Sequence, residues 1–150
     1  MIKFKKIEHN VENLFPAAIK ILKEDKAINV AYLFGSYAKG KASPLSDIDI
    51  ALLLDEAFPS NNYFDKRLEL HPKIAKILKT DEIDLVILNQ ASPVLAYNIL
   101  KNGKVLFTKN QNSKVRFETK VISQYLDTQK MRTLNLNRMK QRLTEGTFGK

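Results

Sequence analysis

Four residues of this chain have the types and the spacing that phosphate and metal chemistry require. Gly35 and Ser36 stand together, and ten residues later come Asp47 and Asp49 with one isoleucine between them. Glycine lets the backbone approach a ligand closely, and a serine at a turn can leave backbone N–H groups facing an anion. Two carboxylates at this spacing can bridge a pair of cations about 3.5 to 4 Å apart. Together these residues predict a site for nucleotidyl transfer.

The two aspartates stand directly before an apolar run. Residues Ile50 to Leu54 indicate a buried strand. Side chains alternate along a strand, so Asp47 and Asp49 are expected on one face, with Cα atoms about 6 to 7 Å apart. Carboxylate oxygens suit Mg²⁺, whose coordination is usually completed by water and substrate phosphates. We therefore expect two Mg²⁺ ions as cofactors.

A third carboxylate, Asp84, is embedded in a further apolar segment, residues 81–88. An ionised group inside a strand requires a partner or a chemical role. We expect Asp84 to lie beside Asp47 and Asp49 across the sheet, to share one metal ion, and to place the attacking hydroxyl or accept its proton. The alternative is an ordinary acid at the edge of a strand, because the role of Asp84 rests on position and not on a signature.

With these residues in place, the chain resembles the minimal nucleotidyltransferases of the DNA polymerase β superfamily. The family hallmark is Gly-Ser, a spacer, Asp-x-Asp and a third acid on a later strand. Those places are filled here by Gly35, Ser36, Asp47, Asp49 and Asp84. The family's habit at neighbouring positions is also matched, by Ala38, Gly40 and Ser46. The resemblance extends over residues 10–145, since the small size and the long C-terminal helix also fit.

The resemblance implies both a fold and an activity. The implied fold is α/β, of the α+β kind: a small mixed β-sheet flanked by helices, as in polymerase beta-like nucleotidyltransferases, with a long C-terminal helix. The implied donor is ATP, bound at Gly35 and Ser36. Many members are antitoxins paired with a HEPN-domain toxin encoded next door. For this chain the resemblance thus implies AMP transfer onto a tyrosine of a HEPN partner, which silences the ribonuclease activity of that partner.

The acceptor follows from the resemblance alone, so three other functions stay open. The chain could neutralise a toxin by binding, without catalysis. It could modify a small molecule, as the aminoglycoside nucleotidyltransferases do, or an RNA 3′ end. A chain of 150 residues has little material for an extra acceptor-binding domain, which favours an acceptor supplied by another protein.

The elements that must position these residues alternate along the chain. We expect a single nucleotidyltransferase domain over 1–150, with a core over about 10–108 and a basic helix over about 112–144. Helices are predicted over 10–25, over 63–79 with a kink or a break at Pro72, and from Ser92 to Gly103; strands are predicted over 28–34, 50–54, 81–88 and 104–108.

The C-terminal segment carries most of the charge. Residues 109–150 hold ten Lys or Arg against three Asp or Glu, which is +7 of the net +9. A partly periodic apolar stripe, Phe117, Val121, Tyr125, Leu134 and Met139, is expected to face the core and leave the basic face in solvent. Docking of a partner helix is the second interpretation. Nucleic acid is the third, because the aromatic residues are not arranged as stacking platforms.

Composition excludes several other classes. The chain has no cysteine, which excludes disulfides and thiolate metal sites. It has no Gly-Lys-Ser/Thr ending of a P-loop, no signal-peptide pattern and no apolar run of membrane-spanning length. We therefore expect a cytoplasmic protein without a membrane partner.

Overall fold

The computed structural model describes residues 10–145. In chain order its helices and strands are α1 (Phe15–Glu24), β1 (Ile28–Phe34), β2 (Ile48–Leu54), α2 (Tyr63–Leu78), β3 (Ile83–Ile87), α3 (Pro93–Asn102), β4 (Lys104–Thr108) and α4 (Gln111–Glu145). Every helix and strand expected from the sequence is present, with ends that differ by a few residues. The predicted α/β fold class, with a small mixed sheet and a long C-terminal helix, is confirmed.

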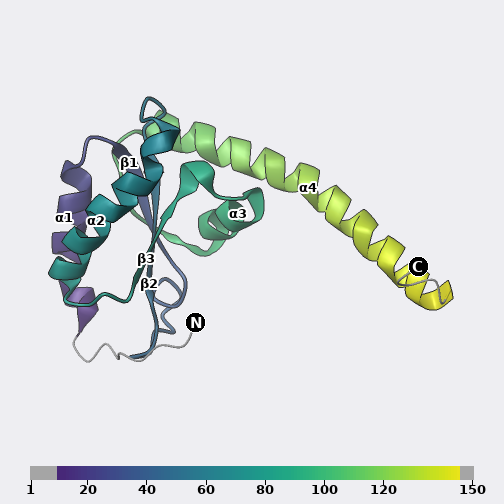
Figure 1. Cartoon of the computed structure of the whole chain (residues 1–150), viewed down its shortest axis with the longest axis horizontal. Coiled ribbons are helices and arrows are strands. Elements are labelled where there is room, and N and C mark those ends of the chain that lie inside the picture. The colour runs from purple at the N-terminus through teal and green to yellow at the C-terminus, as the bar shows by residue number, and fades with distance from the viewer. Residues whose placement is uncertain (1–9, 146–150) are drawn as a thin grey trace.

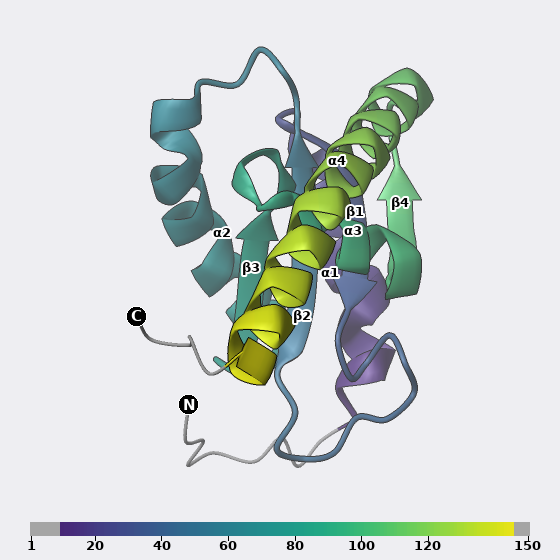
Figure 2. The same ribbon diagram turned by 90° about the vertical axis from the view of Figure 1, so that its right-hand side faces the viewer.

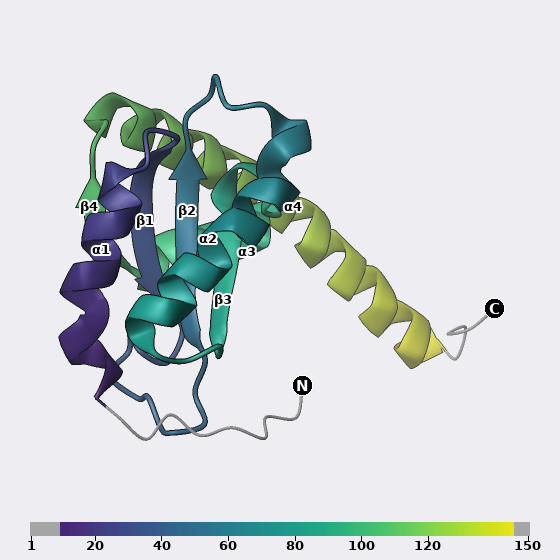
Figure 3. The same ribbon diagram turned by 60° about the vertical axis from the view of Figure 1, so that its left-hand side comes forward.

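The four strands form one mixed sheet in the order β3-β2-β1-β4. Strand β1 is antiparallel to both β2 and β4, whereas β2 and β3 are parallel. Helices α1 and α2 cover one face of the sheet, which is turned toward the viewer in Figure 3. Helix α3 and the first part of α4 cover the other face, which Figure 2 shows. The sheet is thus a middle layer between two helical layers (Figure 1).

Alternation along β2 divides its side chains between two apolar clusters. Ile48, Ile50 and Leu52 belong to the cluster that packs against α1 and α2. Ala51 and Leu53 belong to the cluster that packs against α3 and α4. Because the side chains of a strand alternate, the residue at position 49 faces the α3/α4 side. The buried strand thereby fixes the direction of the carboxylate that it carries.

Helix α2 contains a proline in its interior and is nevertheless one helix. Of the two outcomes expected at Pro72, a kink or a break, the break does not occur, although proline removes a backbone donor. The buried face of α2 holds the helix on the sheet through Leu70, Ile74 and Leu78. Lys79, in the left-handed region at φ 56°, ends it.

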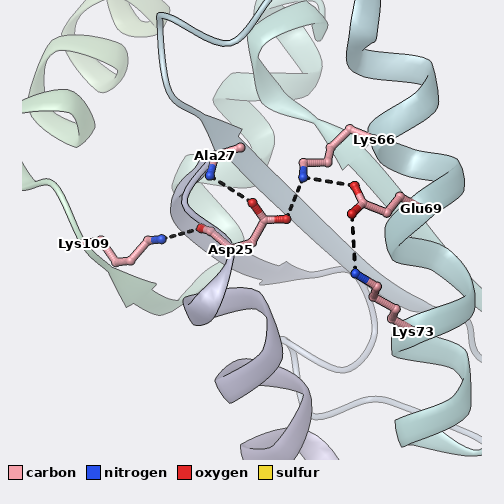
Figure 4. Close-up of polar contacts among 6 residues, drawn as sticks. All are labelled: Asp25, Ala27, Lys66, Glu69, Lys73 and Lys109. Carbon is pink, nitrogen blue, oxygen red and sulfur yellow. Dashed lines mark hydrogen bonds and ion pairs between the residues drawn. The ribbon is translucent and has the colours of Figure 1, made fainter.

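A charged cluster joins the end of α1 to α2 and β4 (Figure 4). The Lys66 ammonium donates to Asp25 Oδ2 at 2.7 Å and to Glu69 Oε2 at 3.1 Å. The Ala27 N–H donates to Asp25 Oδ1 at 2.9 Å, and Lys109 Nζ reaches the Asp25 carbonyl oxygen at 2.5 Å. Burial raises the pKa of Asp25, but the hydrogen bonds from Lys66 and Ala27 outweigh it and hold that pKa below its ordinary value.

The first turns of α4 are fastened to the body by both polar and apolar contacts. Asn29 Nδ2 donates to the buried Ser113 hydroxyl at 3.2 Å. The Tyr32 hydroxyl, on β1, donates to Glu118 Oε1 at 3.2 Å. Further along, Val121 is buried in the α3/α4 cluster, and the Tyr125 ring stacks on Tyr97 of α3 at 3.8 Å between centroids.

Beyond Tyr125 the helix leaves the body, as Figures 1 and 3 both show. Leu134 and Met139 are 46% and 48% exposed. The prediction that these two residues face the core is therefore wrong, whereas Phe117, Val121 and Tyr125 do pack against it. The physical reason is length: at about 1.5 Å per residue a helix of 35 residues is about 50 Å long, more than the sheet and α3 can cover.

Candidate active site

One row of residues crosses three strands at the end of the sheet where β1 stops and β2 starts. Phe34, the last residue of β1, pairs with Asp49, and Asp49 pairs with Asp84 of β3. Gly35 and Ser36 follow Phe34 directly in the chain. Strand register therefore brings the Gly-Ser turn next to two carboxylates that come from distant parts of the sequence.

Asp49 and Asp84 occupy equivalent positions in parallel neighbours. Each is the second residue of its strand, and paired residues of parallel strands point to the same face. Asp49 is half-buried, and Asp84, on the edge strand β3, is exposed. The half-buried Val86 lies on the same face as Asp84. The expectation that Asp84 lies beside Asp49 is thus confirmed by the register.

Asp47 lies in a different setting from the other two acids. Strand β2 begins at Ile48, so Asp47 is the last residue of the preceding loop and its side chain is exposed. The alternation argument that placed it with Asp49 therefore does not extend to it. Within residues 10–145, no group of three or more Asp, Glu, His or Cys side chains forms a ready metal-binding cluster.

Gly35 is required at its position for two independent reasons. Its φ of +72° lies in the left-handed region, which disfavours residues with a Cβ. A Cβ at Gly35 would also stand 2.1 Å from Asp49 Oδ2, far inside any real contact. The absent side chain therefore leaves room for the Asp49 carboxylate beside the turn.

The loop between β1 and β2 is organised at both of its ends. After Gly35 and Ser36 the chain turns back on itself, with the Lys39 N–H donating to the Gly35 carbonyl and the Lys41 N–H to the Ser36 carbonyl, at 3.2 and 3.0 Å. The side chains of Lys39 and Lys41 are exposed. Ala38 is buried and fixes the turn to the core.

Ser43 and Ser46, which are not among the predicted site residues, hold the far end of this loop. The Ser43 N–H donates to Ser46 Oγ at 2.9 Å, and the Ser46 N–H donates to the Ser43 carbonyl at 2.9 Å. The Leu45 N–H also contacts Ser43 Oγ at 3.3 Å. Ser46 directly precedes Asp47, so this small network sets where that acid leaves the loop. The sequence signal was the Ser-Pro-Leu-Ser segment, which is typical of a side-chain-capped turn.

The donor set fits a magnesium ion. Asp47, Asp49 and Asp84 offer only carboxylate oxygens, the hard ligands that Mg²⁺ prefers. The space beside Asp49 Oδ2 is kept free of a side chain by Gly35. Residues of this kind can hold a cation together with the phosphates of a nucleotide.

Comparisons with known proteins agree with this geometry. The family model for the polymerase beta nucleotidyltransferase domain matches residues 17–112, which contain all five predicted site residues. Among residues 10–145, no helix is both long enough and apolar enough to cross a membrane.

Similar proteins and structures share a common description. A protein adenylyltransferase, MntA, of Shewanella oneidensis is 38% identical over 108 residues, which cover 71% of this chain and 73% of that protein. A solved toxin-antitoxin structure with AMP-PNP superimposes with a TM-score of 0.66 at 32% identity, over 85% of this chain and 96% of the other.

A second solved structure contains a tri-AMPylated Shewanella oneidensis HEPN toxin in complex with MNT antitoxin. It superimposes with a TM-score of 0.65 at 31% identity, over 86% of this chain and 98% of the other. The family model covers well over half of the chain, and the motif, the strand register and the relatives agree with it. The chain belongs to the polymerase beta nucleotidyltransferase family.

Proposed function

We propose that this chain is a Mg²⁺-dependent protein adenylyltransferase that moves AMP from ATP to a tyrosine hydroxyl of a HEPN ribonuclease toxin, and that it acts as the antitoxin in the cytoplasm. The observation that carries this proposal is the row formed by Phe34, Asp49 and Asp84, which sets the Gly-Ser turn beside two carboxylates. A triphosphate at the turn lies within reach of carboxylates that can hold its counter-ions.

The nucleotide site is built from the turn and the two acids that follow it. Gly35 and Ser36 bind the phosphates through backbone N–H groups and the serine hydroxyl. Asp47 and Asp49 would hold the Mg²⁺ ions, with Asp84 as a further ligand. Bound Mg²⁺ would offset the negative charge of the phosphates and of departing pyrophosphate. The clearance at Gly35 keeps the Asp49 carboxylate in place for this role.

Asp84 faces the acceptor. It positions the acceptor hydroxyl and takes its proton while the hydroxyl oxygen forms a bond to the α-phosphorus of ATP. The bond from the α-phosphorus to the bridging oxygen breaks, and pyrophosphate carries away that electron pair. Asp84 is exposed on the edge strand β3, so a side chain of another protein can reach it.

The relatives support the choice of donor and acceptor. The similar Shewanella oneidensis protein is named a protein adenylyltransferase, and the similar solved structures contain AMP-PNP in one case and an AMPylated HEPN toxin in the other. A protein acceptor also suits a chain that is a single small domain, since the acceptor then brings its own binding surface.

Intact mass spectrometry tests the proposal. The HEPN-domain protein of the neighbouring gene is incubated with this chain, ATP and Mg²⁺, and its mass is compared with that of an untreated sample. Mass added in whole AMP units is expected with the wild-type chain. It should be lost with Asp47→Asn or Asp49→Asn, because each removes a carboxylate from the metal site.

Asp65→Asn is the matched control. It makes the same chemical change at an exposed position on α2, on the opposite side of the sheet, and should transfer AMP like the wild type. Transfer that persists in Asp49→Asn would contradict the metal-site assignment. A tight complex without added mass would instead indicate neutralisation by binding, and neither complex nor mass would point to a small molecule or RNA as acceptor.

A further inference from the structure

The projecting part of α4, residues 126–145, is a feature that nucleotidyl transfer does not explain. This arm contacts little of the body after Tyr125, and nearly all of its described side chains are exposed (Figure 1). Most helical stability in proteins comes from tertiary packing of an apolar face and not from helix propensity. The arm lacks that packing, although it continues a helix whose first turns are held on the body.

The outer side of α4 carries an apolar stripe with one polar interruption. Val115, Ile122, Leu136 and Leu143 stand at multiples of seven residues, with Gln129 at the middle position of the series, and Leu126 follows Ile122 by four. This is the spacing of a helix that packs against another helix. All five apolar side chains are exposed, from 46% at Ile122 to 61% at Leu143. An exposed apolar stripe of this length is typical of a surface that another protein covers.

The charge of the arm indicates what kind of helix covers it. Residues 126–145 contain five Lys or Arg and two Asp or Glu. Lys130 lies beside the stripe and Lys140 lies within it, and neither forms an ion pair among the described residues. A second copy of the arm would bring like charges together, which is destabilising, whereas acidic residues along a partner helix would be attracted.

The root of the arm is rigid enough to present this surface. Tyr125 is held between Tyr97, stacked at 3.8 Å, and the Arg132 guanidinium, 4.7 Å from its ring centroid. Arg132 also donates to the Thr128 hydroxyl at 2.6 Å. The stack of Tyr125 on Tyr97 fixes the direction of the first arm turn relative to α3, the Arg132 contacts lie within α4 itself, and the outer stripe stays exposed.

We propose that the outer stripe of α4 docks an amphipathic helix of the HEPN toxin whose apolar seam is flanked by acidic residues. This inference rests on the proposed function, because the toxin is the protein that the active site must meet. The arm then supplies affinity at a distance from Asp84, and the exposed active site needs only to meet the tyrosine. Binding and transfer are thus carried by different parts of the chain.

Isothermal titration of the full-length chain with the HEPN protein tests the docking. The stripe variant, Leu136→Gln with Leu143→Gln, should bind the toxin at least about tenfold more weakly than wild type. The control variant, Met131→Gln with Leu134→Gln, also removes two exposed apolar side chains, but on the opposite side of the helix, and should stay within about twofold of wild type. Circular dichroism checks that both variants keep their helix.

A charge variant tests the second part of the argument. Lys130→Glu with Lys140→Glu should weaken binding, and added salt should weaken it less than in the wild type, since attraction to acidic residues is replaced by repulsion that salt screens. Equal loss in the stripe and control variants, or no loss in either, would overturn the docking proposal. Absence of toxin binding by the wild-type chain would overturn it too, as would a dimer of this chain that only the stripe variant abolishes.

The docking and the chemistry can fail separately. If the stripe variant loses affinity but still transfers AMP at saturating toxin, both proposals are supported. If it loses affinity while even the wild type adds no AMP, the docking is supported and the transferase function falls. If wild type and stripe variant bind and transfer AMP equally well, the docking is overturned and the function is supported.

Discussion

Gly35→Ala is the substitution that most sharply separates the proposed chemistry from the stability of the fold. A Cβ added at Gly35 would lie 2.1 Å from Asp49 Oδ2, so the two atoms must move apart by 0.9 Å to reach the shortest real contact of 3.0 Å and by 1.3 Å to reach ordinary contact at 3.4 Å. Displacement of a catalytic group by about 1 Å can cost about 100-fold in rate. We therefore expect AMP transfer to fall by about 100-fold or more.

Gly40→Ala is a close control for this change. Gly40 lies in the same loop and also has a left-handed backbone, φ +68° against +72° at Gly35, but a Cβ there would meet nothing within 4 Å. Both variants should lose about 1 to 2 kcal/mol of stability from the backbone conformation, or about 2 to 8 °C in Tm for a chain of this size. Only Gly35→Ala should lose activity.

Two assays on both variants separate an effect on the chemistry from an effect on the fold. Initial rates of AMP transfer to the HEPN protein measure the chemistry, and thermal denaturation measures the fold. Similar drops in Tm with a large loss of rate in Gly35→Ala alone would support the arrangement described here. Equal rates in the two variants would refute the argument that clearance beside Asp49 matters to the reaction.

Three further predictions concern the fold. The folded-state pKa of Asp25 is lowered, so the stability that its pairing with Lys66 contributes is present above the ordinary pKa of 3.8 and is lost as pH falls through the folded pKa. Lowering the pH through this range should therefore reduce the free energy of unfolding of the wild type by more than that of Asp25→Asn. Pro72→Ala should raise the free energy of unfolding by about 1 to 3 kcal/mol, since it restores a backbone donor inside α2, and a lowered Tm would contradict this. Tyr32→Phe removes the hydrogen bond to Glu118 and should cost about 1 kcal/mol by chemical denaturation, with ATP binding unchanged; an unaltered midpoint would show that this bond does not anchor α4.

The order of helices and strands, and the proximity of Asp84 to Asp49, could be predicted from the sequence. Alternating apolar runs with turn residues between them locate the strands, and Ser92, Pro93 and Gly103 bound α3 as expected. The placement of Asp84 beside Asp49 was also predicted, but for a reason that does not hold: Asp84 is exposed on the edge strand β3, so burial does not require a partner for it, and strand pairing brings it beside Asp49. The strand positions and the helix ends depend on local pattern, which sequence carries directly.

Other features depend on long-range geometry that local pattern does not contain. The sheet order and the exact clearance between Gly35 and Asp49 arise from pairing between strands, so the glycine's contact with that carboxylate could not be foreseen. Nor could the direction of α4 be read from its periodicity, because an apolar stripe has the same spacing whether it meets the core or a partner. Leu134 and Met139 were assigned to the core for this reason.

A crystal structure of the chain with AMP-PNP and Mg²⁺ is the sharpest test of the proposed active site. The phosphates are expected at Gly35 and Ser36, and Mg²⁺ is expected to be bound by Asp47 and Asp49, with Asp84 at the same centre. A nucleotide bound elsewhere, for example in the hollow of about 420 Å³ beside Arg116 and Lys120 at the other end of β2, would contradict it.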